Sequence, residues 1–366
     1  MKLGILGTRG IPARYGGFET LAEELSARLA ARGHDVTVYT RTRYAERGVR
    51  EWRGARVRVL PTIPTKYLDT VAHGLLSGFD AALERFDAVL VCNAINAAAC
   101  FLPRLSGRTR VVLNVDGLER HRRKWNAAGQ LAYEISEKLS TIVPDAVVSD
   151  ARVIRDYYRE RYGFESHFIP YGGDLPEATG RATLDRLGLA PEGYVLYVSR
   201  LEPENNADAV VRAYRDVPGS TPLVVVGDAP YAKDYIERVR AEADPRVKFP
   251  GAIYGEGYRE LLSSAAVYVH ATEVGGTHPA LVEALGYGRP VLYNASPENE
   301  EVAGGAGLPF DVRQPQTLTR LLAGFLDEPD SASVWKERAK ARATERYRWD
   351  DVADRYEAVL RGAGLR

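Results

Sequence analysis

The sequence predicts a two-domain α/β protein in which each domain has a parallel sheet covered by helices on both faces. Three observations support this prediction. The chain has 366 residues, more than a single core usually holds. Strand-like and helix-like segments alternate along it, and the alternation restarts after a stretch rich in glycine and proline at 167–180.

The first series begins with a short apolar strand, "KLGILG", that ends in a glycine-rich loop. The segment 18–33 follows as an amphipathic helix, because Leu21, Leu25 and Leu29 share one face and Gly33 can end it. Further β-branched runs, separated by helical patterns, are at 35–41, 57–61, 88–93, 110–115 and 146–150. This alternation indicates a parallel sheet, since parallel strands need crossover helices.

A second strand–helix series starts at 194–201. Its later strands are expected at 222–228, 247–253, 266–272 and 290–295. We interpret 167–180 as the linker between two Rossmann-like domains that face each other across a cleft. Open α/β sheets bind ligands at the carboxyl ends of their strands, so we expect a ligand site between the domains.

Composition excludes several classes of protein. The formal net charge is zero, which gives no general electrostatic reason for nucleic acid binding. Cys92 and Cys100 match no metal-binding spacing and suggest a reducing compartment without disulfides. There is no apolar run long enough to span a bilayer and no signal-peptide pattern. We therefore expect a cytoplasmic protein.

The N-terminal glycines do not form a dinucleotide-binding motif. Gly4, Gly7 and Gly10 precede the pair Gly16-Gly17, and this spacing is not G-x-G-x-x-G. A P-loop, a G-x-S-x-G elbow and H-E-x-x-H are also absent from the sequence. An enzyme dependent on NAD or FAD is therefore disfavoured.

The stretch "EVGGTHPALVEALGYGRPV", 273–291, predicts a helix that begins at Pro279 after Gly275 and Gly276. A helix N-terminus favours phosphate, while Glu283, one turn deeper on the same face, suits the hydroxyls of a ribose. This pattern predicts a nucleotide lying along the helix start. The alternative is that the glycines only make a tight turn and Glu283 is a solvated surface residue.

Nearly the whole chain resembles glycosyltransferase family 4, the retaining nucleotide-sugar enzymes of the GT-B fold, and most closely the bacterial rhamnosyltransferase-like subgroup. The matching pieces include "GTRGIPARYGGFETLAEEL" (7–25), "VDGLERHRRKW" (115–125), "IPYGGD" (169–174), "VSRLEPENN" (198–206), "VVVGDAP" (224–230), "VKFPGAI" (247–253), 273–291 and "ENEEVAGGAGL" (298–308). The terminal "YRWDDVADRYEAVL" (347–360) resembles the helix that returns to the first domain. The resemblance implies an N-terminal acceptor-side domain at 1–170, a nucleotide-sugar domain at 171–345 and a returning helix at 346–366.

The resemblance also implies roles for individual donor-site residues. Arg200 would contact the diphosphate, and Glu283 would bind the ribose. The stretch 249–253, ending in Ile253, would hold the nucleobase. The other donor-side residues implied are Gly16, Gly17, Asn205, Gly227, Asp228, Gly275, Gly276, Thr277 and His278.

The sequence departs from the family pattern in three places. Asn205 stands where the family usually has a lysine, five positions after Arg200. The first glutamate of the family's paired motif falls on Gly275, so Glu273 would have to replace it. Asp116 stands after the fourth strand where a histidine is common. Together with Arg200, we place Asp116 and Glu273 among the catalytic candidates.

Other residues admit two interpretations. His278 would touch the sugar or phosphate, or cap the helix. His270, at the end of a strand, is interpreted as a core histidine. Tyr15, Arg14 and Glu119 would meet a substrate, or only pack in loops.

The basic stretch "ERHRRKW" (119–125), with Arg122 and Arg123, would dock an anionic membrane or acceptor, or be a solvated helix face. We assign Tyr15, Glu119, Arg122 and Arg123 to the acceptor side. A weak peripheral contact with the inner face of the cell membrane follows from this assignment.

The resulting hypothesis is a retaining glycosyltransferase that moves a sugar, rhamnose by the subgroup resemblance, from a nucleotide-diphosphate donor to a glycan or lipid-linked acceptor. No D-x-D occurs, so we expect neither a metal nor a cofactor, with Arg200 and helix dipoles stabilising the leaving group. Alternatives are a nucleotide-sugar epimerase or phosphorylase on the same fold, or a non-catalytic nucleotide-sugar sensor.

Overall fold

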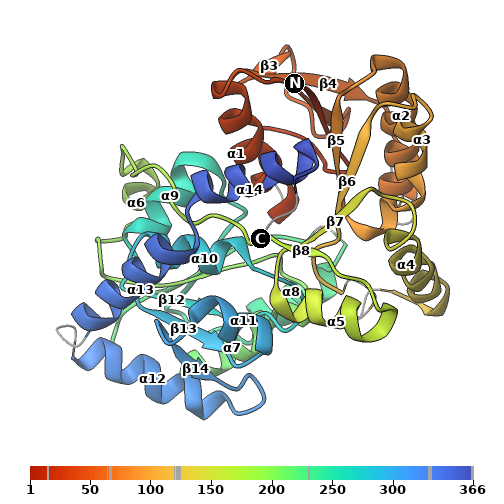
Figure 1. Cartoon of the computed structure of the whole chain (residues 1–366). Helices are drawn as coiled ribbons and strands as arrows, with labels where there is room; N and C mark the ends of the chain where they lie inside the picture. Colours follow the sequence, from red (N-terminus) through yellow and green to blue (C-terminus); the bar gives the residue numbers. More distant parts are fainter. Residues whose placement is uncertain are drawn as a thin grey trace. The chain divides into compact units, whose positions relative to one another are not determined.

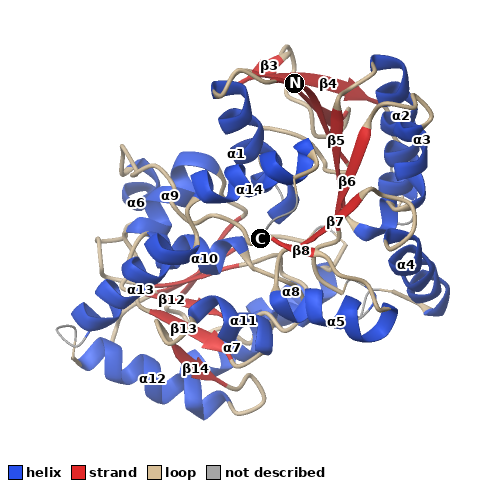
Figure 2. Ribbon diagram, viewed as in Figure 1, coloured by secondary structure: helices blue, strands red, loops and turns tan. Residues whose placement is uncertain are grey.

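The computed structural model of the chain divides into two compact units (Figures 1 and 2). It describes residues 1–14, 16–63, 65, 68–118, 120, 125–229, 231–328 and 332–363. Unit 1 consists of Met1–Tyr171 and Trp349–Arg366, and unit 2 of Gly172–Arg348. Each unit is an α/β domain, and the expected fold class of two parallel-sheet domains with a returning C-terminal helix is confirmed.

Unit 1 contains an eight-stranded sheet in the order β3-β4-β2-β1-β5-β6-β7-β8, parallel except for the β3–β4 pair. Its strands are β1 (Lys2–Leu6), β2 (Asp35–Arg41), β3 (Glu51–Trp52), β4 (Ala55–Leu60), β5 (Ala88–Cys92), β6 (Arg110–Asn114), β7 (Ala146–Ser149) and β8 (His167–Phe168). The strand β8 lies inside the stretch interpreted as a linker, because His167 pairs with Val148 of β7. The linker prediction therefore began too early.

Helices cover both faces of this sheet. They are α1 (Gly17–Ala31), α2 (Leu68–Glu84), α3 (Phe101–Arg104), α4 (Ala127–Ser140), α5 (Arg152–Tyr162) and α14 (Trp349–Arg361), with short 3₁₀ helices η1 (Ala94–Asn96) and η2 (Ala98–Cys100). Apolar residues of α1 and α14 pack on one face, and those of α2, α4 and α5 pack on the other. Cys92 and Cys100 are free and buried within this unit.

The final helix α14 is an integral part of unit 1. Trp349, Val352, Ala353, Tyr356, Val359 and Leu360 are all buried. Their spacing of three and four residues gives one continuous apolar stripe. The stripe packs against α1 and the central strands, with the Trp349 ring edge-on to Tyr171 at 6.5 Å between centroids.

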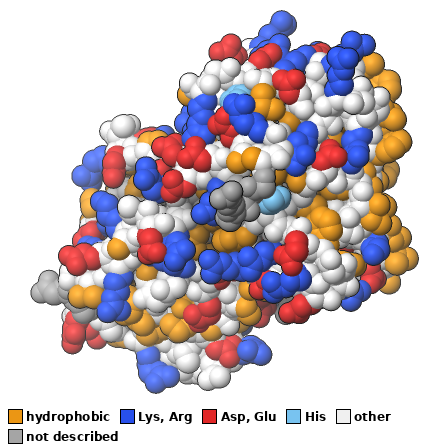
Figure 3. Space-filling view, in the orientation of Figure 1, with side chains coloured by type: hydrophobic (Ala, Val, Ile, Leu, Met, Phe, Trp, Pro, Cys, Tyr) orange, Lys and Arg blue, Asp and Glu red, His pale blue; other side chains and the backbone are white. Residues whose placement is uncertain are grey.

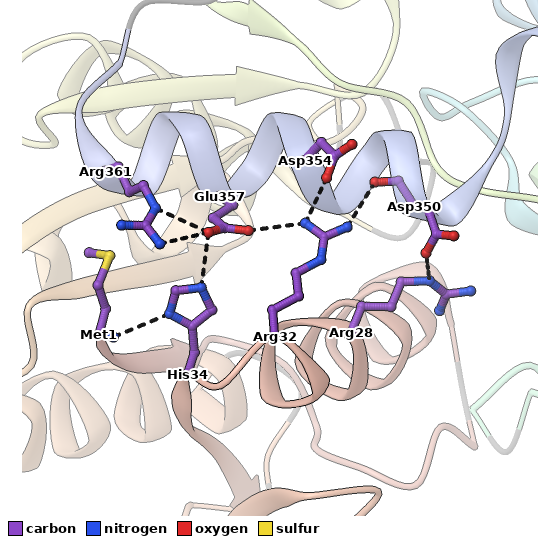
Figure 4. Close-up of polar contacts among 8 residues, drawn as sticks. All are labelled: Met1, Arg28, Arg32, His34, Asp350, Asp354, Glu357 and Arg361. Atoms are coloured by element: carbon purple, nitrogen blue, oxygen red, sulfur yellow. Dashed lines mark hydrogen bonds and ion pairs between the residues drawn. The ribbon is translucent and has the colours of Figure 1, made fainter.

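Ion pairs secure the polar side of the same helix (Figure 4). Glu357 accepts hydrogen bonds from Arg361 at 2.8 Å, Arg32 at 3.0 Å and His34 at 3.1 Å. Arg28 pairs with Asp350 at 3.1 Å. The hydrogen bond from Arg361, followed by those from Arg32 and His34, lowers the pKa of Glu357 to about 2.

Unit 2 contains a six-stranded parallel sheet in the order β11-β10-β9-β12-β13-β14. Its strands are β9 (Val195–Val198), β10 (Leu223–Val226), β11 (Val247–Gly251), β12 (Val267–His270), β13 (Val291–Asn294) and β14 (Leu308–Phe310). Its helices are α6 (Ala182–Leu187), α7 (Ala207–Arg215), α8 (Lys233–Ala241), α9 (Gly255–Ser263), α10 (Pro279–Gly286), α11 (Pro297–Ala303), α12 (Pro315–Asp327) and α13 (Ala332–Arg346), with a 3₁₀ turn η4 (Pro203–Asn205). Apolar residues of α7, α8 and α12 cover one face, and those of α9, α10 and α13 cover the other.

In the part of the chain that the structure describes, no helix combines the length and the apolar character needed to cross a bilayer.

We predict that Glu357→Gln destabilises unit 1 by about 1–2 kcal/mol at pH 7. The carboxylate has a pKa near 4.5 when unfolded and about 2 when folded. Its contribution is therefore complete above pH 4.5 and is lost as the pH falls toward 2. Urea unfolding followed by tryptophan fluorescence reports mainly on this unit, because three of the four tryptophans, Trp52, Trp125 and Trp349, lie in it and only Trp335 lies in unit 2.

A matched control is Glu345→Gln, since Glu345 pairs only with its exposed neighbour Arg346 among the contacts described. The control is expected to leave the unfolding midpoint within experimental error. A Glu357→Gln midpoint equal to that of the wild type at pH 7 would show that this network contributes nothing measurable.

Candidate functional site

The strand order of unit 2 reverses beside β9, and this reversal defines the candidate site. From β9 the chain proceeds outward through β10 to β11, then returns to the other side of β9 and proceeds through β12 to β14. The loops after β9 and β12 therefore leave the same edge of the sheet in opposite directions. Such a switch point is where open α/β sheets form a ligand crevice.

Two hydrogen bonds join these neighbouring loops. The backbone N–H of Glu273, after β12, donates to the carbonyl of Glu204, after β9, at 3.0 Å. The side-chain amide of Asn206 donates to the carbonyl of Ala271 at 2.9 Å. The loop that carries Arg200 and the loop 273–278 are thus held side by side.

Arg200 lies two positions after the end of β9, and its side chain is 27% exposed, so it is accessible at this edge. It lies 3.6 Å from the buried carboxylate of Glu202. Tyr231, from the loop after β10, donates its hydroxyl to the same carboxylate. Glu202 therefore links the loops after β9 and β10 and orients the arginine.

Asn205 does not present its amide at the surface. It is 3% exposed, and its side-chain nitrogen donates to the carbonyl of Arg200 at 2.6 Å. Its own carbonyl accepts from Tyr197 at 2.6 Å. Asn205 therefore shapes the backbone at Arg200 from inside the loop, and its expected contact with the donor stays a prediction.

The loop after β10 requires glycine at its first position. Gly227 has φ +147°, and a Cβ there would lie 1.8 Å from the carbonyl oxygen of Ser199. No side chain fits at that distance. Asp228 follows, exposed, with one carboxylate oxygen accepting the N–H of Ala229 at 2.8 Å. Ile253, after β11, is half-buried at the same edge of the sheet.

The helix predicted to begin at Pro279 does begin there. The loop before it packs around the rings of His270 and His278. His278 is the N-cap residue, but its side chain makes no capping hydrogen bond. Its ring instead lies 4.8 Å from that of His270, and a Cβ on Gly275 would meet it at 2.3 Å. The capping interpretation is therefore wrong, and Gly275 is needed for close approach. Gly276 and Thr277 are buried next to this layer.

His270 is 3% exposed, and burial lowers its pKa to about 3. Its ring is therefore neutral at physiological pH. Tyr268 lies within 3.4 Å of its Nδ1. These contacts confirm that His270 is a core histidine.

Glu283 is 4% exposed, so the interpretation as a solvated surface residue is wrong. It lies in the second turn of α10, and the hydroxyl of Tyr258, from α9, donates to its Oε2. Burial, and then the negative charge of Glu283, raise the pKa of Tyr258 well above its usual value. The tyrosine thus stays a hydrogen-bond donor and fixes the carboxylate.

Asn299 anchors the loop of Glu273 from the other side. It is fully buried on α11, and its side-chain nitrogen donates to the carbonyls of Thr272 at 2.9 Å and Asn294 at 3.0 Å. Glu273 itself is half-buried at the exit of β12. The sheet edge thus brings together Arg200, Gly227, Asp228, Glu273 and 275–278.

Unit 1 has the same kind of strand reversal beside β1. Gly16 is the N-cap residue of α1, which starts at Gly17. Glu19 and Glu23 of that helix hold the preceding loop, accepting the N–H groups of Arg9 at 2.7 Å and Ala13 at 2.5 Å. The helix therefore holds the described loop residues 9–13 from their backbone N–H groups.

Asp116 lies just after β6 with φ +54°, and its N–H donates to the side chain of Asn114 at 2.9 Å. Asn114 in turn donates to the hydroxyl of Tyr356 at 2.6 Å. The returning helix α14 therefore helps to position Asp116. Tyr15, Glu119, Arg122 and Arg123 lie outside the described residues, so their acceptor-side assignments remain predictions.

Three supporting residues were missed by sequence reasoning: Tyr258, Tyr231 and Glu202. Tyr258 is 25 positions before Glu283 on a different helix, and nothing local signals the pairing. Glu202 could have been noticed, because it lies two positions after Arg200 in "RLEPENN". Among the described residues, no group of three or more His, Cys, Asp or Glu side chains could hold a metal ion.

Comparisons with known proteins agree with this geometry. Residues 16–172 match the glycosyl transferase 4-like domain, and residues 186–342 match the glycosyl transferases group 1 family. The two matches correspond to the two units. Together they span most of the chain.

The chain is similar to the GDP-mannose-dependent alpha-(1-6)-phosphatidylinositol monomannoside mannosyltransferase of Mycobacterium tuberculosis, 26% identical over 98% of both chains. It is 27% identical to the O-antigen chain mannosyltransferase B of Escherichia coli, over 46% of this chain and 45% of that protein. Among solved structures, the sucrose-phosphate synthase of Thermosynechococcus elongatus superposes with a TM-score of 0.82, at 18% identity over 99% of this chain and 98% of that one. The chain is a glycosyltransferase of the family 4 type with the two-domain GT-B fold.

Proposed function

We propose that this enzyme transfers a hexose, with retention of configuration, from a nucleotide-diphosphate sugar to a hydroxyl of a glycan or lipid-linked acceptor. The observation that carries the proposal is the buried Glu283 in the second turn of α10, held by Tyr258 beside the loop that follows β12. Arg200, on the adjoining loop, supplies a cation for the diphosphate. A ribose on the carboxylate and phosphates over 275–277 suit these groups.

The donor we favour is GDP-mannose rather than a rhamnose nucleotide. The relatives described above carry mannosyltransferase names, and the relative that aligns over 98% of both chains is named as GDP-mannose-dependent. The expected rhamnosyltransferase subgroup has no support from these relatives. Their names also disfavour an epimerase, a phosphorylase or a sensor. Binding of GDP-mannose against dTDP-rhamnose and UDP-glucose, measured by calorimetry, tests this choice.

The chemistry of transfer requires stabilisation of negative charge as the nucleoside diphosphate leaves. Arg200 would bind the departing phosphate, with the N–H groups at the start of α10 adding a favourable dipole. The acceptor hydroxyl would then attack from the same face of the sugar, with the leaving phosphate taking its proton. Asp116 in unit 1 and Glu273 in unit 2 are proposed as groups that orient the acceptor and the sugar.

We also propose that the reaction needs no metal and no bound cofactor. The cation at the diphosphate would be Arg200, oriented by Glu202. Full activity after exhaustive treatment with EDTA would support this, and activity lost to EDTA and restored by magnesium or manganese would contradict it.

We predict that Glu283→Gln weakens binding of the nucleoside diphosphate by about 10–100-fold, because a charge-assisted hydrogen bond contributes roughly 1.5–3 kcal/mol. The same substitution should weaken the binding of 2′- and 3′-deoxy nucleotides much less, since these nucleotides lack a hydroxyl that the carboxylate can bind. Isothermal titration calorimetry with the ribo and deoxy forms measures both effects.

Tyr258→Phe is the companion variant, because it keeps Glu283 but removes the hydroxyl that fixes it. We expect about 3–10-fold weaker binding, as for one neutral hydrogen bond. The matched controls are Tyr293→Phe and Glu300→Gln, a similar tyrosine–glutamate pair at 2.8 Å elsewhere in unit 2. Equal affinity of Glu283→Gln and wild type for the ribonucleotide would refute the ribose assignment.

We predict that Arg200→Ala lowers kcat by about 10²–10³-fold, while donor affinity falls by a smaller factor. The arginine would act mainly as charge develops on the leaving group. Steady-state kinetics and donor titration separate the two effects. Arg212→Ala is the control, since Arg212 is an exposed arginine paired with Asp208 on α7. A variant whose kcat is unchanged would remove Arg200 from the proposed chemistry.

A further inference from the structure

Helix α2 in unit 1 exposes an unusual row of large apolar side chains. Leu68, Leu75, Leu76, Phe79 and Leu83 are between 46% and 68% exposed. Their spacing of three, four and seven residues places them on one side of the helix. The opposite side of α2 is already packed, so this outward row contributes nothing to the core of unit 1.

The apolar surface continues over the neighbouring helices. Phe101 and Leu105, on and directly after α3, are 58% and 60% exposed. Leu131 and Ile135 of α4, and Ile142 just after it, are between 53% and 63% exposed. The helix α2 packs against α3, and both α2 and α4 contact η1 and η2.

We call the exposed apolar side chains of α2, α3 and α4 the apolar face. Figure 3 shows apolar side chains along the right-hand margin of the view, where Figure 1 labels α2, α3 and α4. Ten large apolar side chains, each 46% exposed or more, lie on or directly after these helices, and an exposed apolar patch of this kind marks a site of interaction.

The charges beside the apolar face are unevenly compensated. Glu84 pairs with Lys2 at 2.8 Å, Glu134 pairs with Arg161, and Asp145 pairs with Arg104 at 3.0 Å. Each of these acids is therefore neutralised by a base. Three exposed bases, Arg85, Arg108 and Lys138, have no acid partner among the described residues.

The fold brings these bases to one end of the apolar face. Strands β5, β6 and β7 are adjacent and parallel, so the segments that precede them lie along the same edge of the sheet. Arg85 and Leu83 precede β5, and Arg108 and Leu105 precede β6. Ile142 precedes β7. Cationic and apolar side chains therefore both lie in the segments along this edge.

We propose that the apolar face docks onto a lipid bilayer whose headgroups are anionic. Apolar side chains would enter the boundary between headgroups and acyl chains, while the uncompensated bases would contact phosphate. A second copy of this chain fits less well, because bases outnumber acids on this edge. Asp87, which accepts the backbone N–H of Lys2 and pairs with no base among the described residues, is one acid against three uncompensated bases. The docking depends on the surface of unit 1 and not on the donor chemistry of unit 2.

The test measures partition of the full-length protein onto vesicles of phosphatidylcholine with 30% phosphatidylglycerol, by flotation and by titration of vesicles. Wild type should bind these vesicles more tightly than pure phosphatidylcholine, and high salt should remove that difference. Phe79→Ser with Leu83→Ser should lower the partition coefficient by about tenfold or more. Arg85→Glu with Arg108→Glu should remove the preference for anionic vesicles.

Matched controls come from exposed residues of unit 2. Val334→Ser changes a side chain that is 50% exposed on α13, and Arg320→Glu reverses an exposed base on α12. Both should partition as wild type does. Affinity for the nucleoside diphosphate should be unchanged in every variant, so a failure of the donor assignment would be seen separately.

The proposal is overturned if wild type does not bind the vesicles, or if the Phe79 and Leu83 double variant binds as tightly as wild type. A third result would also overturn it. If wild type does not float but sediments as a dimer, and the double variant sediments as a monomer, the apolar face is a surface for self-association.

Discussion

Within each unit, the order of the strands depends on the central position of the strand that comes first in the sequence. β1 and β9 are central strands, and each sheet grows outward from its first strand in two directions. Parallel pairing forces every connecting loop at the carboxyl ends onto one edge. The change of direction beside the first strand then leaves neighbouring loops that diverge. Arg200 and 273–278 flank this point in unit 2, so the candidate donor site follows from topology before any side chain is considered.

Many helices and strands could be predicted from the sequence, because they depend on patterns of residues that are close together in it. The period of Leu21, Leu25 and Leu29 gave α1, and Pro279 marked the start of α10. The two-residue strand β8 could not be recognised in the same way. Its pairing with β7 is decided by a neighbour in space and not by any pattern within 167–168.

The candidate site was only partly predictable, because its supporting contacts join distant segments. Tyr258 and Glu283 meet through the packing of α9 and α10, and Tyr231 reaches Glu202 from a different loop. Asn205 illustrates a second difficulty. A motif identifies the position where a family lysine usually acts, but not that an asparagine there turns inward to hold a carbonyl.

The discontinuous composition of unit 1 has a consequence for biosynthesis. Its first segment ends at Tyr171, yet the helix that carries Trp349 and Tyr356 is made only after the whole of unit 2. A nascent chain that has released 1–171 exposes the strip of α1 and the central strands that α14 later covers. Unit 2 needs no later segment to complete its core, since all its elements are contiguous in the sequence. Unit 1 begins before unit 2 in the sequence and is therefore the one of the two whose folding is completed later, and Asp116 gains its support from Tyr356 only when α14 has been translated.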